Sequence, residues 1–145
     1  MPAAGHTKSG VIKADVILAS KQRRPIIGEI KTATDSDAFG ALLQGLHAAA
    51  QLAGPFQRAR VRLWCSNCLY VLKDEIPDVY VLLVNHPTTG NKPEILKAAV
   101  QLRRELEKHP AITDRVGRLE FINVECDGPG GVITGMRAEP RHELI

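Results

Sequence analysis

The sequence predicts a single α/β domain built on a mixed β-sheet flanked by helices. Its 145 residues are 44% hydrophobic and 24% charged, which is typical of a globular domain with its own core. Apolar runs of strand length alternate with two helical stretches, and this alternation favours a two-layer or three-layer α/β arrangement. No repeat or linker divides the chain, so residues 11–145 should form one domain after a mobile segment at residues 1–10.

The first predicted element is a hairpin over residues 11–32, in which two apolar runs flank a basic, polar turn. The two runs are too close in sequence for a parallel crossover and should pair in antiparallel fashion. Asp15 falls in the first predicted strand. Glu29 and Lys31 fall in the second, where a spacing of two puts both side chains on one face. The hairpin would bring Asp15 beside them, and a divalent cation would satisfy carboxylates that converge among apolar residues.

A helix is predicted next over residues 38–53, because residues 34–37 (Thr-Asp-Ser-Asp) offer N-cap side chains and Gly54-Pro55 ends the pattern. Its expected core face consists of Phe39, Leu42, Leu43, Leu46, Ala50 and Ala53. A polar stripe about a third of a turn away consists of Gly40, Gln44, His47 and Gln51. His47 could approach the carboxylates from this helix, although a hydrogen-bonded histidine at the rim is the simpler interpretation.

The middle of the chain is predicted to add two strands. Residues 58–64 alternate arginine with other residues, and we expect a strand whose arginines share one face. Residues 69–72 form a short, ambiguous apolar run. Residues 78–84 are nearly all apolar, which suits a central strand buried on both faces. A loop should follow at residues 86–90.

The last third is predicted to hold one helix and two strands. The helix should run from Pro93 to Lys108 and end at His109-Pro110, with Arg103 among its solvated residues. Its expected core face consists of Ile95, Ala99, Leu102 and Leu106. Strands over 118–126 and 132–137 should enclose the glycine-rich turn at 127–131.

The acidic residues and the lysine of the hairpin resemble those of a known enzyme superfamily. Asp15, thirteen intervening residues and then Glu29-Ile30-Lys31 at the end of an apolar strand resemble the PD-(D/E)XK, or restriction-endonuclease-like, nucleases. The helix carrying Gln44 is similar to the glutamine-bearing helix of the RecB-like branch, and Holliday-junction resolvases belong to the same superfamily. The resemblance covers residues 11–53 of the 145.

This resemblance implies a metal-dependent nuclease that hydrolyses phosphodiester bonds in nucleic acid, with DNA as the expected substrate. Asp15, Glu29 and the backbone carbonyl of Ile30 would bind Mg²⁺ or Mn²⁺. Lys31 would orient or deprotonate the attacking water and offset negative charge in the transition state. Gln44 would position these groups or bind a phosphate. The sequence departs from the family in having no acid, and hence no glutamate-bearing helix, before the first strand.

Composition and charge set the expected partners. The net charge of +3 permits a polyanionic partner, and phosphate contacts could come from Lys21, Arg23, Arg24, Arg58, Arg60 and Arg62. Arginines scattered over solvated faces are the alternative. No apolar run approaches the ~20 residues of a membrane span, so no membrane partner is expected. Three cysteines and the polar start indicate a cytoplasmic protein. A homodimer would suit an enzyme that cuts two strands.

Two alternatives to the nuclease stay open. A non-catalytic nucleic-acid-binding or assembly module would have the same fold, with acids that hold no metal. A small zinc or thiol protein would use Cys65 and Cys68, which are spaced as half of a zinc site or as a redox pair. Further zinc ligands could be Cys126 with His86 or His109. The β-prone run at 69–72 argues against a redox pair that opens a helix.

Overall fold

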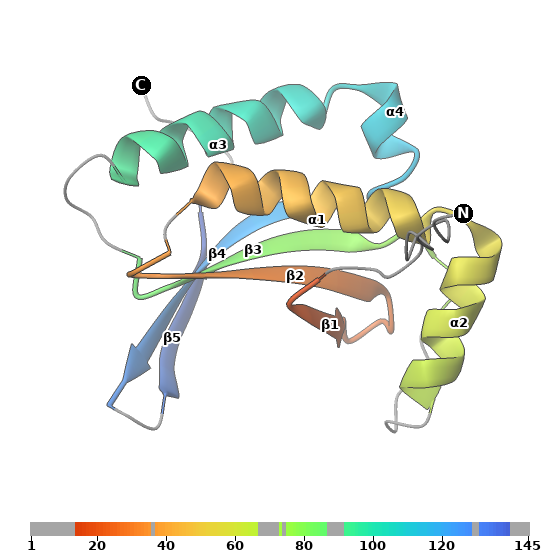
Figure 1. The fold of residues 1–145 in the computed structure, drawn as a ribbon, viewed down its shortest axis with the longest axis horizontal. Helices are drawn as coiled ribbons and strands as arrows, with labels where there is room; N and C mark the ends of the chain where they lie inside the picture. The colour runs from red at the N-terminus through yellow and green to blue at the C-terminus, as the bar shows by residue number, and fades with distance from the viewer. Residues whose placement is uncertain are drawn as a thin grey trace, which may run out of the picture.

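A five-stranded mixed β-sheet lies at the centre of the computed structural model, which describes residues 14–35, 37–66, 73, 75–86, 92–128 and 131–139. The strands are β1 (Val16–Ala19), β2 (Pro25–Thr32), β3 (Asp78–Val84), β4 (Leu119–Asp127) and β5 (Val132–Ala138). The helices are α1 (Ala38–Leu52), α2 (Pro55–Ser66), α3 (Lys92–Leu106) and α4 (Pro110–Thr113). Figure 1 shows α1 and α3 over the same face of the sheet. The predicted α/β class is therefore confirmed, whereas the N-terminal segment at 1–10 lies outside the described residues.

The strands follow one another across the sheet in the order β1-β2-β3-β4-β5. The β1–β2 hairpin is antiparallel, as predicted, and β4 pairs with β5 in the same way. Between them β2, β3 and β4 are parallel. The turn before β5 contains Gly128 and Gly131 at φ values of 67° and 62°, a conformation that glycine adopts without steric cost. The carboxyl ends of the parallel strands meet at one end of the sheet, the usual position of ligand sites in open α/β sheets.

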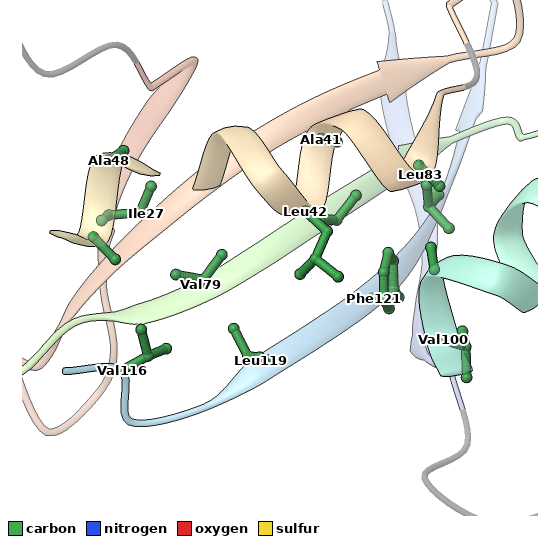
Figure 2. Packing of buried hydrophobic residues seen from close by; sticks show 14 of the residues in the cluster. Ile27, Ala41, Leu42, Ala48, Val79, Leu83, Val100, Val116, Leu119 and Phe121 are labelled. Carbon is green, nitrogen blue, oxygen red and sulfur yellow. The ribbon is translucent and has the colours of Figure 1, made fainter. Parts of the chain in front are cut away.

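The hydrophobic core fills the space between the sheet and the helices α1 and α3. Figure 2 shows Leu42 projecting from α1 toward the strands that carry Val79 and Phe121. The predicted core face of α1 is wrong by part of a turn, since Phe39 and Leu43 are 38% and 47% exposed. The buried positions are mostly small residues, namely Ala38, Ala41, Leu42, Gly45, Ala48, Ala49 and Leu52. Helix α1 approaches the sheet most closely at Gly45, where a Cβ atom would lie 2.5 Å from Cγ1 of Val79.

The strand predicted over residues 58–64 is wrong, because these residues belong to helix α2. Pro55 opens the helix, a position where its missing N–H costs nothing, and arginine, alanine and leucine are good helix formers. The alternation of Arg58, Arg60 and Arg62 imitated the period of a strand. At about 100° per residue Arg58 and Arg62 share one face of this helix, and Arg60 lies on the other side. The run at 69–72 lies outside the described residues, as does most of the loop expected at 86–90.

Helix α3 agrees with its prediction in position but not at Arg103. Ala99 is fully buried as expected, whereas Arg103, expected in solvent, is wholly buried as well. Arg103 follows Ala99 by four residues and so lies on the same helix face. Its guanidinium lies 5.8 Å from the ring centroid of Phe121, and its Nη1 atom lies 3.9 Å from a carboxylate oxygen of Glu120. The short helix α4, which His109 caps, was not predicted.

Strand β3 is central in the sheet, as predicted, but is fully buried on only one face. Val79, Val81 and Leu83 face the helices and are buried, whereas Tyr80, Leu82 and Val84 on the opposite face are half-buried. The predicted strands before and after the glycine-rich turn are confirmed as β4 and β5. Within the described ranges, no helix has both the length and the apolar character needed to cross a membrane.

Candidate active site

A cavity of about 660 Å³ lies where the start of β1, the second half of β2 and helix α1 meet. The residues that line it are Ala14, Asp15, Glu29, Ile30, Lys31, Asp35, Gln44 and His47. All four side chains expected in the catalytic site, Asp15, Glu29, Lys31 and Gln44, therefore face one cavity. Asp35 is a charged lining residue that was not predicted to belong to the site.

Asp15 lies directly before β1 and not within the first strand as predicted. Val16 pairs with Gly28, so continuing the register would put Ala14 opposite Ile30, but β1 begins only at Val16. The N–H of Ile30 donates instead to Oδ2 of Asp15 at 2.8 Å. Paired residues in an antiparallel ladder exchange both backbone bonds, so the carbonyl of Ile30 faces the same edge as its N–H. The edge of β2 thus presents a carboxylate and a carbonyl side by side.

Glu29 is 4% exposed and points from β2 toward α1. Burial raises its pKa from an ordinary 4.5 to about 7; the charge of Asp15 and a hydrogen bond with it act in the same direction, whereas Lys31 acts against them. Oε1 of Glu29 is buried and has no hydrogen-bond partner among the described residues. A Cβ atom at Gly45 of α1 would lie 3.6 Å from Cγ of Glu29. The carboxylate is therefore enclosed, costly to ionise and incompletely satisfied.

Lys31 is 9% exposed and lies on the same face of β2 as Glu29. Its Nζ atom donates to Oδ2 of Asp35 at 2.9 Å. This bond holds the pKa of Asp35 below its usual range, although Asp35 itself is largely in solvent. Sequence reasoning treated Asp35 only as one of several capping candidates, whereas Asp37 caps α1 by accepting from the N–H of Gly40 at 2.8 Å. A loop conformation determines this pairing, and no periodicity would have revealed it.

Two residues of the predicted polar stripe of α1, Gln44 and His47, line the cavity. His47 lies one turn after Gln44, and its Nε2 atom is 3.0 Å from Nε2 of Gln51 on the next turn. The prediction of a hydrogen-bonded histidine is confirmed, and its position on the cavity wall keeps it within the candidate site.

The basic residues expected to bind nucleic acid lie elsewhere. Lys21, Arg23 and Arg24 occupy the turn between β1 and β2, at the opposite end of the short β1 from Asp15. Arg24 forms ion pairs with Glu75 at 3.2 Å and with the buried Asp78 at 3.4 Å. Burial raises the pKa of Asp78, and Arg24 opposes this shift. Arg24 therefore has a structural role at the start of β3.

The three arginines of α2 are also remote from the carboxylates. Arg58 and Arg62 line a small crevice with Pro25 and Pro77, at the end of the sheet where β2 and β3 begin. Arg58 donates to the backbone carbonyl of Ala53, and Arg60 donates to the side chain of Gln57 at 3.4 Å. The structure does not bring these side chains to the cavity that holds the predicted catalytic residues.

The cysteines show no sign of a zinc or redox site in the described residues. Cys126 is a free thiol, and Cys65 is buried in the last turn of α2. It therefore ends a helix, whereas a thioredoxin-like pair opens one. Cys68 lies outside the described residues. In the part of the chain that the structure describes, no cluster contains three or more His, Cys, Asp or Glu side chains suited to a metal.

Comparison of the chain with protein-family models, with curated proteins and with solved structures gave no match. The assignment of a function therefore depends on the geometry and chemistry of this cavity.

Proposed function

We propose that the chain is a metal-dependent nuclease of the PD-(D/E)XK type, which hydrolyses phosphodiester bonds in nucleic acid, with DNA as the expected substrate. One observation carries the proposal: the buried carboxylate of Glu29 adjoins that of Asp15 and keeps an oxygen without a hydrogen-bond partner among the described residues. Two carboxylates in contact repel each other unless a proton or a cation lies between them. A cation would bind both and satisfy the remaining oxygen.

The donor set fits Mg²⁺ or Mn²⁺, because hard divalent cations prefer oxygen ligands and retain several waters. Asp15, Glu29 and the carbonyl of Ile30 would hold the ion, which would polarise a phosphoryl oxygen and lower the pKa of a bound water. Ion binding would require Glu29 to release its proton. Lys31 would then place an ammonium group beside the reacting phosphate, where little solvent screens its charge. Gln44 would donate an amide hydrogen bond from the cavity wall.

Cleavage of labelled duplex, branched and single-stranded DNA, with Mg²⁺, Mn²⁺ or EDTA, tests the proposal. Glu29→Ala should abolish metal-dependent cleavage, and Lys31→Ala should lower kcat by about 10²–10³. Glu94 and Lys97 of α3 form an exposed ion pair at 2.8 Å and supply matched controls. Glu94→Ala and Lys97→Ala should cut like the unmodified chain. Metal-dependent cleavage that survives in Glu29→Ala would refute the assignment.

A non-catalytic module with the same fold is the second candidate. It is favoured by the small ligand set, since the described residues contain no metal-binding cluster of three acids, histidines or cysteines. The bond between Lys31 and Asp35 also occupies the expected catalytic lysine. Calorimetric titration with Mn²⁺ separates the two candidates. A nuclease should bind the ion with an affinity that Asp15→Ala removes, and a module should give no heat that depends on Asp15.

A further inference from the structure

The cavity is larger and more acidic than one cation and one phosphate require. Three of its lining side chains are acids, Asp15, Glu29 and Asp35, and Lys31 is the one lysine or arginine among the residues that line it. The predicted basic contacts lie in the β1–β2 turn and in α2, away from the cavity. A nucleic-acid strand that reaches the carboxylates must therefore be held near them by other side chains.

Helix α1 presents three such side chains in a row, which we call the α1 ridge: Gln44, His47 and Gln51. Gln44 and His47 line the cavity, and Gln51 follows on the next turn. At 1.5 Å per residue the ridge extends for about 10 Å. Successive phosphates of a DNA strand advance ~3.4 Å along the duplex axis, so this length corresponds to about three nucleotides.

The hydrogen bonding of His47 leaves a donor for a ligand. With the Gln51 amide oriented as it is in the structure, its Nε2 atom donates to Nε2 of His47 at 3.0 Å, and its Oε1 atom is buried with no hydrogen-bond partner among the described residues. The proton of a neutral imidazole then lies on Nδ1. No described residue accepts a bond from Nδ1. In this orientation Gln51 sets the tautomer, and His47 retains an N–H group on an exposed side chain of the cavity wall.

From these contacts we infer that the α1 ridge binds the sugar-phosphate backbone of a nucleic-acid strand next to the phosphate held at Asp15 and Glu29. Gln44 and His47 donate to phosphate oxygens, and Gln51 is a positioning residue that orients His47. Neutral amide and imidazole donors are regular phosphate ligands that carry no sequence information. The inference rests on the proposed function, because it takes the carboxylate pair as the point where the strand would be cut.

Binding of fluorescent single-stranded and duplex DNA, followed by anisotropy at pH 8 with Ca²⁺ in place of Mg²⁺, tests the inference without cleavage. His47→Ala should weaken binding about tenfold, as expected for a hydrogen bond to a charged group. Gln51→Ala should weaken it less, and His47→Gln, which keeps an N–H donor, should recover most of the affinity. Gln101→Ala on α3, an exposed glutamine that does not line the cavity, is the matched control. The slope of log Kd against log salt should stay unchanged in His47→Ala, since a neutral donor releases no counterion.

A second measurement separates this inference from the proposed function. Removal of the ridge should lower kcat/KM for an oligonucleotide more than for a bis-aryl phosphodiester, which has no neighbouring phosphate. Unaltered DNA affinity in His47→Ala, or an equal loss in Gln101→Ala, would overturn the inference whether or not the protein cuts DNA. Ridge-dependent binding by a protein that cuts neither substrate would support the ridge and refute the nuclease.

Discussion

Replacing Glu29 by glutamine should stabilise the metal-free protein at alkaline pH. The substitution keeps the shape of the side chain and removes its charge, and the new amide can donate to the carboxylate of Asp15. Because burial and the neighbouring acid raise the pKa of Glu29 to about 7, the folded protein must deprotonate a group that ionises near 4.5 once unfolded. Ionisation of Glu29 in the folded protein therefore lowers the free energy of unfolding. The glutamine variant has no ionisable group at this position, so its free energy of unfolding is not lowered in this way.

The size and the pH window follow from that shift. Below pH 4.5 Glu29 is protonated in both states and costs nothing. Between pH 4.5 and 7 the unfolded chain releases its proton first, so stability falls by about 1.4 kcal/mol for each pH unit. Above pH 7 the full penalty of about 3 kcal/mol is present. The advantage of Glu29→Gln should therefore grow by about 2–3 kcal/mol between pH 5 and pH 8.

Urea unfolding of both proteins at pH 5 and pH 8 in EDTA measures this difference, with equal m-values as the check on two-state behaviour. Adding Mg²⁺ at pH 8 should then stabilise the unmodified chain and leave Glu29→Gln unchanged, since a ligand stabilises only the state that binds it. A stability difference that is constant from pH 5 to pH 8 would refute the burial argument. Equal stabilisation of both proteins by Mg²⁺ would refute Glu29 as a metal ligand.

Two further substitutions test the packing that surrounds the site. Gly45→Ala should lower the free energy of unfolding by about 1–2 kcal/mol, because the new Cβ would lie 2.5 Å from Cγ1 of Val79. In a protein that also carries Val79→Ala, urea unfolding should show no such penalty for Gly45→Ala. A more stable Gly45→Ala would contradict the close approach of α1 to the sheet. Arg103→Ala should lower the free energy of unfolding by about 3 kcal/mol, because Glu120 loses a buried charge partner. Lys108 is exposed, and Lys108→Ala should change the free energy of unfolding by less than about 0.5 kcal/mol. Equal thermal shifts in these two variants would contradict the burial of Arg103.

The sequence carried enough information to predict which residues come together at the cavity, because the main constraint on them is local. A spacing of two on a strand puts Glu29 and Lys31 on one face, and a short hairpin can only return antiparallel, which brings Asp15 close. The polar stripe of α1 then follows from the helical period, and it brings Gln44 and His47 to the same cavity. These relations hold within one hairpin and one helix, so no long-range contact had to be guessed.

The errors arose where long-range packing overrides local pattern. Arg103 has the charge of a surface residue, yet its helix position and the carboxylate of Glu120 on another element bury it. Phe39 was assigned to the core of α1, but the buried face is rotated away from it and includes Gly45, where α1 approaches β3 closely. Asp35 meets Lys31 through a loop whose conformation leaves no periodic signal.

The unfavourable burial of Glu29 supports the proposed cation site. Two departures from good packing meet at this carboxylate: β1 begins two residues too late to pair with Ile30, and α1 has a glycine where alanine would favour the helix. The first leaves the Ile30 amide to Asp15, and the second lets α1 approach Val79 closely, beside Glu29. A sheet selected for stability alone would extend the ladder and place an apolar residue at position 29. Costly burial of a titratable group is common at functional sites, and a cation bound between the carboxylates would offset its cost.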